Sequence, residues 1–112
     1  MIDVMVNQID ETFVLLADPT RRRAVELLSA GPLRASELAD QLGASRPAMS
    51  RHLRVLRTGG LVDVEFAESD ARGRTYRLRA DRLTALQAWL DQMQAFWNVQ
   101  LGSFKKHAEG DR

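Results

Sequence analysis

The sequence predicts a single, mainly α-helical domain of 112 residues that carries a helix-turn-helix and one β-hairpin. Apolar residues recur at the spacing of amphipathic helices over most of the chain. Residues 61–66 and 75–79 alternate instead between apolar and polar side chains, and a polar turn separates them, which is typical of a β-hairpin. Residues 35–60 combine two short helical patterns with a tight turn. We expect the rest of the chain to hold this segment.

A first helix is expected over residues 1–17. Its apolar side chains recur at helical spacing from Ile2 to Leu16, opposite a polar face that includes Asp3 and Asp10. This helix packs either on the core of its own chain or on a partner subunit, and the sequence leaves both alternatives open.

A second helix is expected to begin after Asp18, which is a good N-cap, with Pro19 as its first residue. It continues to about Ser29. Three successive arginines, at positions 21–23, cannot share one helix face because neighbouring residues differ by about 100°. We expect one of them to pair with Asp18 or Glu26.

The helix-turn-helix is expected over residues 35–58. Its first helix ends before Gly43, which stands where a residue tolerant of positive φ is needed. Ser45 is suited to cap the second helix, and Pro47 lies in its first turn, where a missing N–H costs little. One apolar stripe of this second helix is expected to face the core and is formed by Met49, Leu53 and Leu56.

The other side of this second helix is basic and free of acids. Residues 45–58 contain four arginines and one histidine but no carboxylate. Residues 1–20 carry a net charge of −4 and residues 21–60 a net charge of +5, so the positive charge is concentrated here. Arginine neutralises phosphates and makes paired hydrogen bonds to guanine edges. The alternative is a basic face that is exposed to solvent and binds nothing. The turn and the lack of acids favour nucleic-acid binding instead.

A last helix is expected over residues 81–107, with Asp81 as its cap. It carries apolar residues on two faces, more than one small core can cover, so we expect a twofold-symmetric dimer through the terminal helices. A ligand pocket lined by aromatic side chains such as Trp89 and Phe96 is the competing interpretation. The predicted dimer interface comprises Ile9, Phe13, Leu86, Leu90, Met93, Trp97 and Phe104.

The run LADPTRRRAVELLSAGPLRASELADQLGASRPAMSRHLRVLRTGGLV, followed by GRTYRL, resembles the ArsR family of winged helix-turn-helix transcriptional repressors. The resemblance spans roughly residues 16–78. It implies a winged helix-turn-helix in which residues 61–79 form the wing, and a homodimer that binds operator DNA. The predicted DNA-binding residues on the second helix and the wing are Ser45, Arg46, Pro47, Ser50, Arg51, Arg54, Arg57, Arg72 and Arg74. Tyr76 is expected to pack within the hairpin.

The metal sites known in this family have no counterpart in the sequence. The positions that correspond to the family's Cys-x-Cys site are Arg34 and Ser36, and the last helix offers only Asp91 and His107. We therefore expect no metal and no cofactor. The chain resembles the metal-independent branch of the family. The sequence identifies no inducer, and a regulator that has no inducer is an open alternative.

Other function classes fit less well. The chain has no cysteine, no glycine-rich phosphate loop and no nucleophile motif, so we expect no enzyme activity. It has no apolar run long enough for a membrane helix, and the first 20 residues carry four acids without lysine or arginine, unlike a signal peptide. A cytoplasmic protein is expected. The alternative function is a winged-helix module that binds protein or RNA without an operator.

Overall fold

The computed structural model describes residues 2–66 and 74–110, except the side chains of residues 2–7, 66, 107, 109 and 110. It confirms a mainly helical chain with a small antiparallel sheet. In chain order the elements are α1 (Ile2–Ala17), α2 (Pro19–Leu28), β1 (Leu33–Arg34), α3 (Ala35–Leu42), α4 (Arg46–Thr58), β2 (Val62–Phe66), β3 (Arg74–Leu78) and α5 (Asp81–Gly110).

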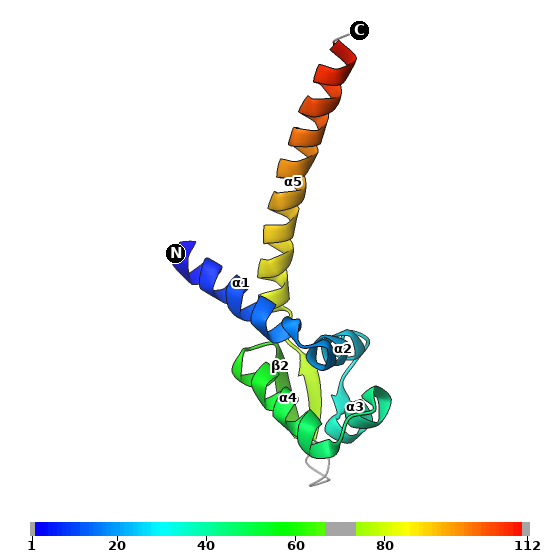
Figure 1. Ribbon diagram of the computed structural model, residues 1–112. Helices are drawn as coiled ribbons and strands as arrows, with labels where there is room; N and C mark the ends of the chain where they lie inside the picture. Colours follow the sequence, from blue (N-terminus) through cyan, green and yellow to red (C-terminus); the bar gives the residue numbers. More distant parts are fainter. Residues whose placement is uncertain (1, 67–73, 111–112) are drawn as a thin grey trace.

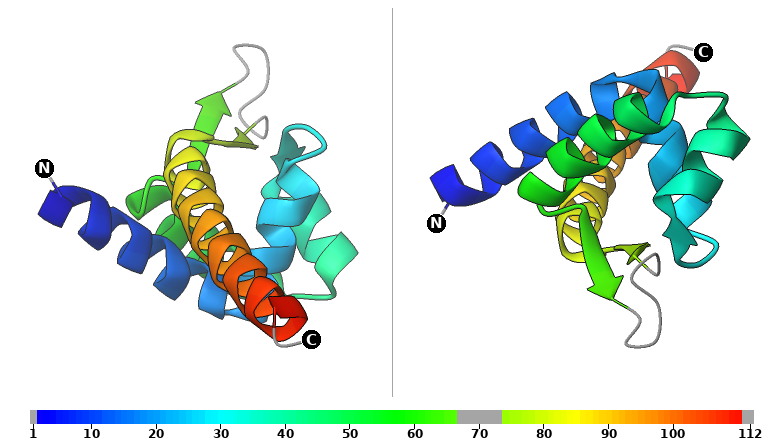
Figure 2. Two further views of the ribbon diagram at one scale, coloured as in Figure 1. Left: turned by 90° about the horizontal axis from the view of Figure 1, so that it is seen from above. Right: turned by 90° about the horizontal axis from the view of Figure 1, so that it is seen from below.

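The molecule consists of a small body and one long projecting helix (Figure 1). Its principal extents are 71 × 33 × 21 Å, and α5 accounts for the longest of them. Seen along α5, α1 lies on one side of its base, whereas α2 and α3 lie on the other (Figure 2). None of the described helices is both long enough and apolar enough to cross a membrane.

The core lies between the helix-turn-helix and the sheet. The predicted inner stripe of α4 is confirmed, because its three members have no exposed surface. Leu38 of α3 is equally buried, and so are Leu61 and Val62, where the chain enters β2. The largest fully buried apolar side chains are Leu38, Met49, Leu53, Leu56, Leu61 and Val62. This packing fixes the rotation of α4, so that its opposite face points outward.

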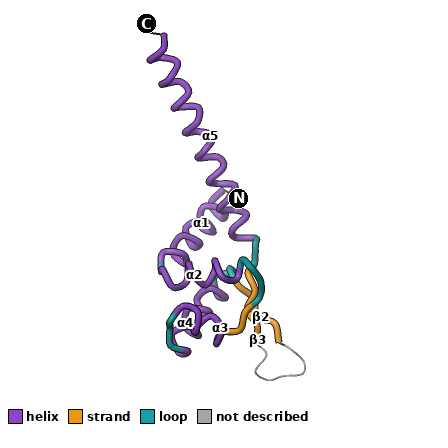
Figure 3. The backbone as a smooth tube through the Cα atoms, turned by 90° about the vertical axis from the view of Figure 1, so that its right-hand side faces the viewer, coloured by secondary structure: helices purple, strands orange, loops and turns teal. Residues whose placement is uncertain are grey.

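The sheet contains a third strand that the sequence did not reveal. The order is β1–β3–β2 and both pairings are antiparallel, and the sheet lies to one side of α2, α3 and α4 (Figure 3). In the hairpin Val64 lies opposite Tyr76, whose other neighbour is Leu33 of β1. A strand of two residues is too short to show the alternation that predicts a strand. Tyr76 packs against the core, as expected.

The arginines at the start of α2 do not pair with acids as predicted. Arg21 donates from Nε to the carbonyl of Leu15 over 2.7 Å and from Nη2 to that of Val14 over 3.2 Å. Arg22 donates to the carbonyl of Leu16 over 3.1 Å. These carbonyls belong to the last turn of α1 and have no partner within the helix, which makes them good acceptors for a cation. Both arginines thus cap α1.

Helix α5 also differs from its prediction in detail. Asp81 is its first residue rather than its cap, and the Asp81 carboxylate accepts from Arg79 over 3.0 Å. The helix extends three residues beyond 107, to Gly110. Its base is held to α1 by an edge-on contact of the Phe13 and Trp89 rings, whose centroids lie 5.6 Å apart. Trp89 therefore serves intrachain packing.

Asp18 caps α2 as predicted. Its carboxylate accepts from the backbone N–H of Arg21 over 3.0 Å. This hydrogen bond is the main reason that the pKa of Asp18 lies below its ordinary value; partial burial opposes the shift, and the charges of His52 and Arg21 add to it. The ionised carboxylate is consequently stabilised in the folded state.

Asp18→Ala is expected to destabilise the fold by about 1 kcal/mol at neutral pH, the usual contribution of an N-cap. Asp18→Asn keeps an acceptor oxygen but lacks the charge, so it isolates the effect of ionisation. Because the folded-state pKa is lowered, the carboxylate stabilises the fold above its unfolded-state pKa, and this stabilisation is lost as the pH falls through the folded-state value. Urea unfolding should give the wild type a larger free energy of unfolding than Asp18→Asn at neutral pH. The two free energies should be equal well below about pH 3.9. A difference that persists or grows in acid would contradict this assignment.

Candidate nucleic-acid interface

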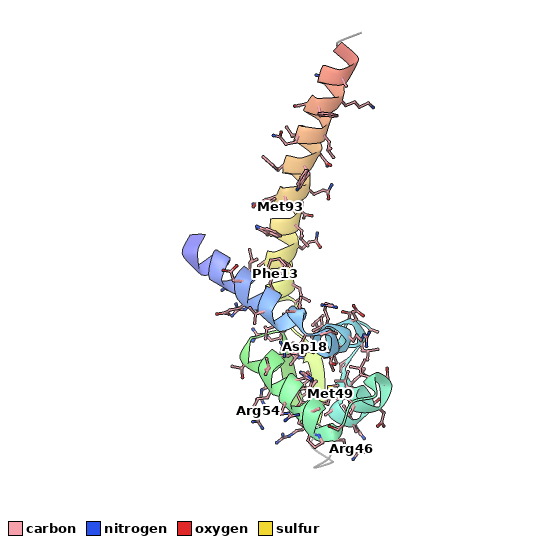
Figure 4. The ribbon with its side chains drawn as sticks, viewed as in Figure 1. Phe13, Asp18, Arg46, Met49, Arg54 and Met93 are labelled. Carbon is pink, nitrogen blue, oxygen red and sulfur yellow. The ribbon has the colours of Figure 1, made fainter. Side chains whose placement is uncertain are left out.

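The exposed side of α4 presents the residues that the sequence assigned to DNA. Met49 points into the body, whereas Arg46 and Arg54 lie on its outside (Figure 4). The burial of the inner stripe leaves this side uncovered, because residues on opposite faces of one helix cannot both reach the core. All the residues of this segment that the sequence assigned to DNA are exposed, namely Ser45, Arg46, Pro47, Ser50, Arg51, Arg54 and Arg57.

These cations form no ion pair with the carboxylates that the structure describes. The hairpin behaves differently, since Arg77 pairs with Glu65 over 2.7 Å and Arg79 contacts Asp63 over 3.7 Å. The positive potential of α4 is therefore available to an external anion, whereas that of the hairpin face is largely compensated.

The turn before α4 sets the angle at which this helix leaves α3. Gly43 has φ 64°, in the left-handed region that favours glycine. The N–H of Ala44 then donates to the carbonyl of Ala39 over 3.0 Å. Ser45 caps α4 as predicted, because its Oγ accepts from the N–H of Ala48 over 3.2 Å. The positive end of the α4 dipole therefore lies at the exposed turn.

The wing is described only in part. Arg74 is exposed at the start of β3. Arg72 lies outside the described residues.

The apolar residues assigned to a dimer interface fall into three groups by exposure. Phe13, Leu90, Trp97 and Phe104 are exposed to 45%, 44%, 55% and 74%. Leu86 and Met93 are half-buried. Ile9 is only 9% exposed, because it packs inside its own chain, so it has little surface left for a partner.

Sequence reasoning missed Leu101, which is 59% exposed on α5. It lies one helical turn beyond Trp97 and so shares its face. Counting four residues from Trp97 would have found it.

Sequence reasoning also missed Arg34, which it considered only as the counterpart of an absent metal ligand. Arg34 and Ser36 line one cleft with Arg46, Ser50 and Arg74. No group of three or more His, Asp or Glu side chains that could hold a metal occurs in the part of the chain that the structure describes. The surroundings of Arg34 suit an anion instead.

Comparisons with known proteins decide the family. The profile of "Bacterial regulatory protein, arsR family" matches residues 18–64. The "HTH-type transcriptional regulator Rv2034" of Mycobacterium tuberculosis is 42% identical over 104 residues, which cover 91% of this chain and 92% of the relative. This chain belongs to the ArsR family. It is thus a DNA-binding transcriptional regulator and not an enzyme, as the sequence predicted.

Two further comparisons concern the role and the fold. The "Transcriptional repressor SdpR" of Bacillus subtilis is 29% identical over 89 residues, which cover 80% of this chain and 92% of that repressor. A solved structure of Mb0332 from Mycobacterium bovis superposes with a TM-score of 0.63 at 23% identity, covering 88% of this chain and 87% of that one. It is described as a homodimeric winged helix-turn-helix DNA-binding domain, which confirms the winged helix-turn-helix fold here.

Proposed function

We propose that this ArsR-family protein is a repressor that binds an inverted-repeat operator as a homodimer, with one α4 in the major groove of each half-site. The observation that carries this proposal is the acid-free basic side of α4, whose arginines pair with none of the described carboxylates. An exposed recognition helix of a helix-turn-helix fits the major groove, and dimers of this kind bind half-sites about one DNA turn apart. A second copy doubles the basic surface and gives it the symmetry of an inverted repeat.

Within α4 the contacts divide by position. Residues of the first two turns and Arg54 would contact base edges, because the N-terminal part of a recognition helix lies deepest in the groove. Arg57, three residues after Arg54, would meet phosphate. Arg72 and Arg74 of the wing would meet the neighbouring backbone or minor groove.

The terminal helices would form the dimer. The C-terminal half of α5 carries five large apolar side chains at more than half exposure, among them Trp97 and Phe104. Exposed apolar surface of this extent marks an interaction site in soluble proteins. The homodimer described for Mb0332 supports a second copy as the partner.

Repression would follow from occupation of the promoter, which excludes the polymerase. The name of SdpR supports repression rather than activation. Because the ligand is chromosomal DNA, the protein would act in the cytoplasm. Neither an inducer nor a cofactor is needed for this function.

Arg46→Ala and Arg54→Ala are each expected to weaken specific binding by about 1–3 kcal/mol if the arginine contacts a base. Footprinting on the DNA upstream of the protein's own gene would locate the operator, and fluorescence anisotropy would measure affinity against salt. Lys105→Gln at the far end of α5 removes the same charge and should leave affinity unchanged. Unaltered operator affinity in both arginine variants would refute the proposed face.

A further inference from the structure

A cleft of about 720 Å³ lies between the first helix and the helix assigned to DNA. In Figures 1 and 2, α1 (blue) and α4 (green) lie next to each other. Each helix lines the cleft with two neighbouring residues and with the two residues one turn further on. The lining residues are Asp10, Glu11, Val14 and Leu15 of α1, and Arg54, Val55, Thr58 and Gly59 of α4. We call it the α1–α4 cleft.

The α1–α4 cleft has a packed floor and apolar walls. Leu15 is only 7% exposed and lies against Gly59, where a Cβ atom would overlap the Leu15 side chain. Gly59 therefore lets α1 approach the end of α4 closely. Val14 on one wall is 67% exposed, and Val55 on the other is 41% exposed. An apolar cleft of this size with a few polar groups around it is typical of small-molecule sites.

Opposite charges stand on the two helices that line the α1–α4 cleft. Asp10 of α1 and Arg54 of α4 are both exposed, and neither forms an ion pair among the described side chains. Glu11 differs, because its carboxylate pairs with Arg82 of α5 over 3.2 Å. The cleft thus offers one carboxylate on α1 and one guanidinium on α4, with apolar surface between them.

This arrangement selects a ligand with two opposite charges and an apolar body. Asp10 would hold an ammonium group, and Arg54 would make paired hydrogen bonds to a carboxylate. Apolar groups between these charges would cover Val14 and Val55. A single amino acid carries both charges on one carbon atom, whereas the ends of a dipeptide are separated by its backbone. The separate helices that carry Asp10 and Arg54 therefore favour a dipeptide.

The α1–α4 cleft faces away from the predicted dimer surface. Phe13 contacts Trp89 of α5, so its side of α1 is turned toward the helix that is expected to pair. Val14 is the next residue and lies about 100° further around α1, on the side that meets α4. Charged residues are also depleted from the centres of protein interfaces. These observations favour a small ligand over a second copy as the occupant.

We propose that the α1–α4 cleft binds an apolar dipeptide as a zwitterion, and that the bound peptide weakens operator binding. The effect on DNA rests on the proposed function, in which Arg54 contacts the operator. One guanidinium cannot hold the peptide carboxylate and a base edge at the same time. The operator and the peptide therefore weaken each other by the same factor, and couplings of this kind are usually about 5- to 150-fold.

Calorimetric titration of the full-length protein with leucyl-phenylalanine, without DNA, would test the site itself. The peptide should bind saturably, whereas its N-acetyl derivative and its C-terminal amide, which each lack one charge, should bind about fivefold or more weakly. Asp10→Asn should abolish the preference over the N-acetyl derivative, and Arg54→Ala the preference over the amide, because each pair of changes removes one interaction. Asp40→Asn makes the same exchange on α3, outside the cleft, and should bind like the wild type. Absence of binding, or equal binding of all three peptides, would overturn the assignment.

Val14→Trp tests the cleft without changing a charge. Val14 is largely exposed, so the larger side chain should fill the cleft and leave the core intact. Binding of leucyl-phenylalanine should be lost, while the circular dichroism spectrum and the sedimentation behaviour stay those of the wild type. Retained binding would place the peptide elsewhere. Dissociation of the dimer would assign the cleft to a second copy, and either result would overturn the proposal.

Fluorescence anisotropy on the footprinted operator would test the coupling. Saturating leucyl-phenylalanine should lower the operator affinity of the wild type by about 5- to 150-fold. At a concentration that half-saturates the wild type, the peptide should affect Asp10→Asn far less. If the peptide binds but operator affinity is unchanged, the coupling is wrong and the proposed function stands. If the wild type binds no operator, the proposed function fails, and calorimetry still decides whether the cleft binds the peptide.

Discussion

Trp97→Glu is expected to yield monomers that bind the operator about a hundredfold or more weakly, because each monomer engages one half-site without the avidity of the pair. Trp97 is 55% exposed although it is large and aromatic. Met93 lies on the part of α5 that extends past α1 (Figure 4), and Trp97 follows it by one helical turn, so packing within one chain leaves it exposed. Leu101 and Phe104 continue the same face and are exposed to 59% and 74%.

A glutamate at position 97 would place an unpaired charge in the apolar interface. Burial of a charge without a partner is costly, so the dimer should dissociate while each chain keeps its own core. Sedimentation equilibrium would report assembly, and anisotropy on the footprinted operator would report affinity. The variant should retain its helical circular dichroism signal, because no fully buried residue of the core changes.

Asn98→Asp is the matched control for Trp97→Glu. It adds the same charge one residue away, on a neighbouring face of α5, and keeps the oxygen that accepts from Gln94 over 3.1 Å. The control should remain dimeric and should bind the operator within about twofold of the wild type. A stable dimer of Trp97→Glu in the ultracentrifuge would remove this face of α5 from the interface.

Leu53→Ala is expected to lower the free energy of unfolding by about 2–5 kcal/mol, since it removes a buried side chain and leaves a cavity. Leu53 has no exposed surface and lies at the centre of the inner stripe of α4. It contributes to the packing that holds the basic side outward. Urea unfolding at fixed protomer concentration would measure the loss.

Val55→Ala serves as the control for Leu53→Ala on the same helix. Val55 is 41% exposed, so the substitution should change stability by only about 0.5 kcal/mol. At temperatures where Leu53→Ala is still folded, its operator affinity should stay near that of the wild type, because Leu53 touches the core and not DNA. Equal destabilisation by both substitutions would show that the inner stripe is not the principal support of α4.

The helix-turn-helix could be predicted almost completely because its determinants are local. Ser45 caps α4 within its own first turn, and Gly43 adopts positive φ without help from distant residues. The spacing of Met49, Leu53 and Leu56 identifies an inner face by itself. Once that face is assigned, the exposure of Arg46 and Arg54 follows from helix geometry.

Predictions that depended on long side chains were less successful. Arg21 and Arg22 were expected to pair with a carboxylate, but they donate to backbone carbonyls of α1. Several partners lie within the reach of an arginine, and the free end of a preceding helix competes well with a solvated acid.

Ile9 was assigned to a partner surface but packs within its own chain, because an amphipathic pattern does not state which molecule covers its apolar face.

The sequence by itself determined the helices, their caps, the hairpin and the acid-free face of α4, because each depends on residues within a few turns of one another. Only the tertiary structure decided which cations share a site. The pairing of β1 with β3 brings Arg34 beside Arg74, and no local pattern encodes a contact between residues so far apart in the chain. The tertiary structure likewise showed that α5 extends beyond any surface of its own chain, since that depends on how much of the helix α1 covers.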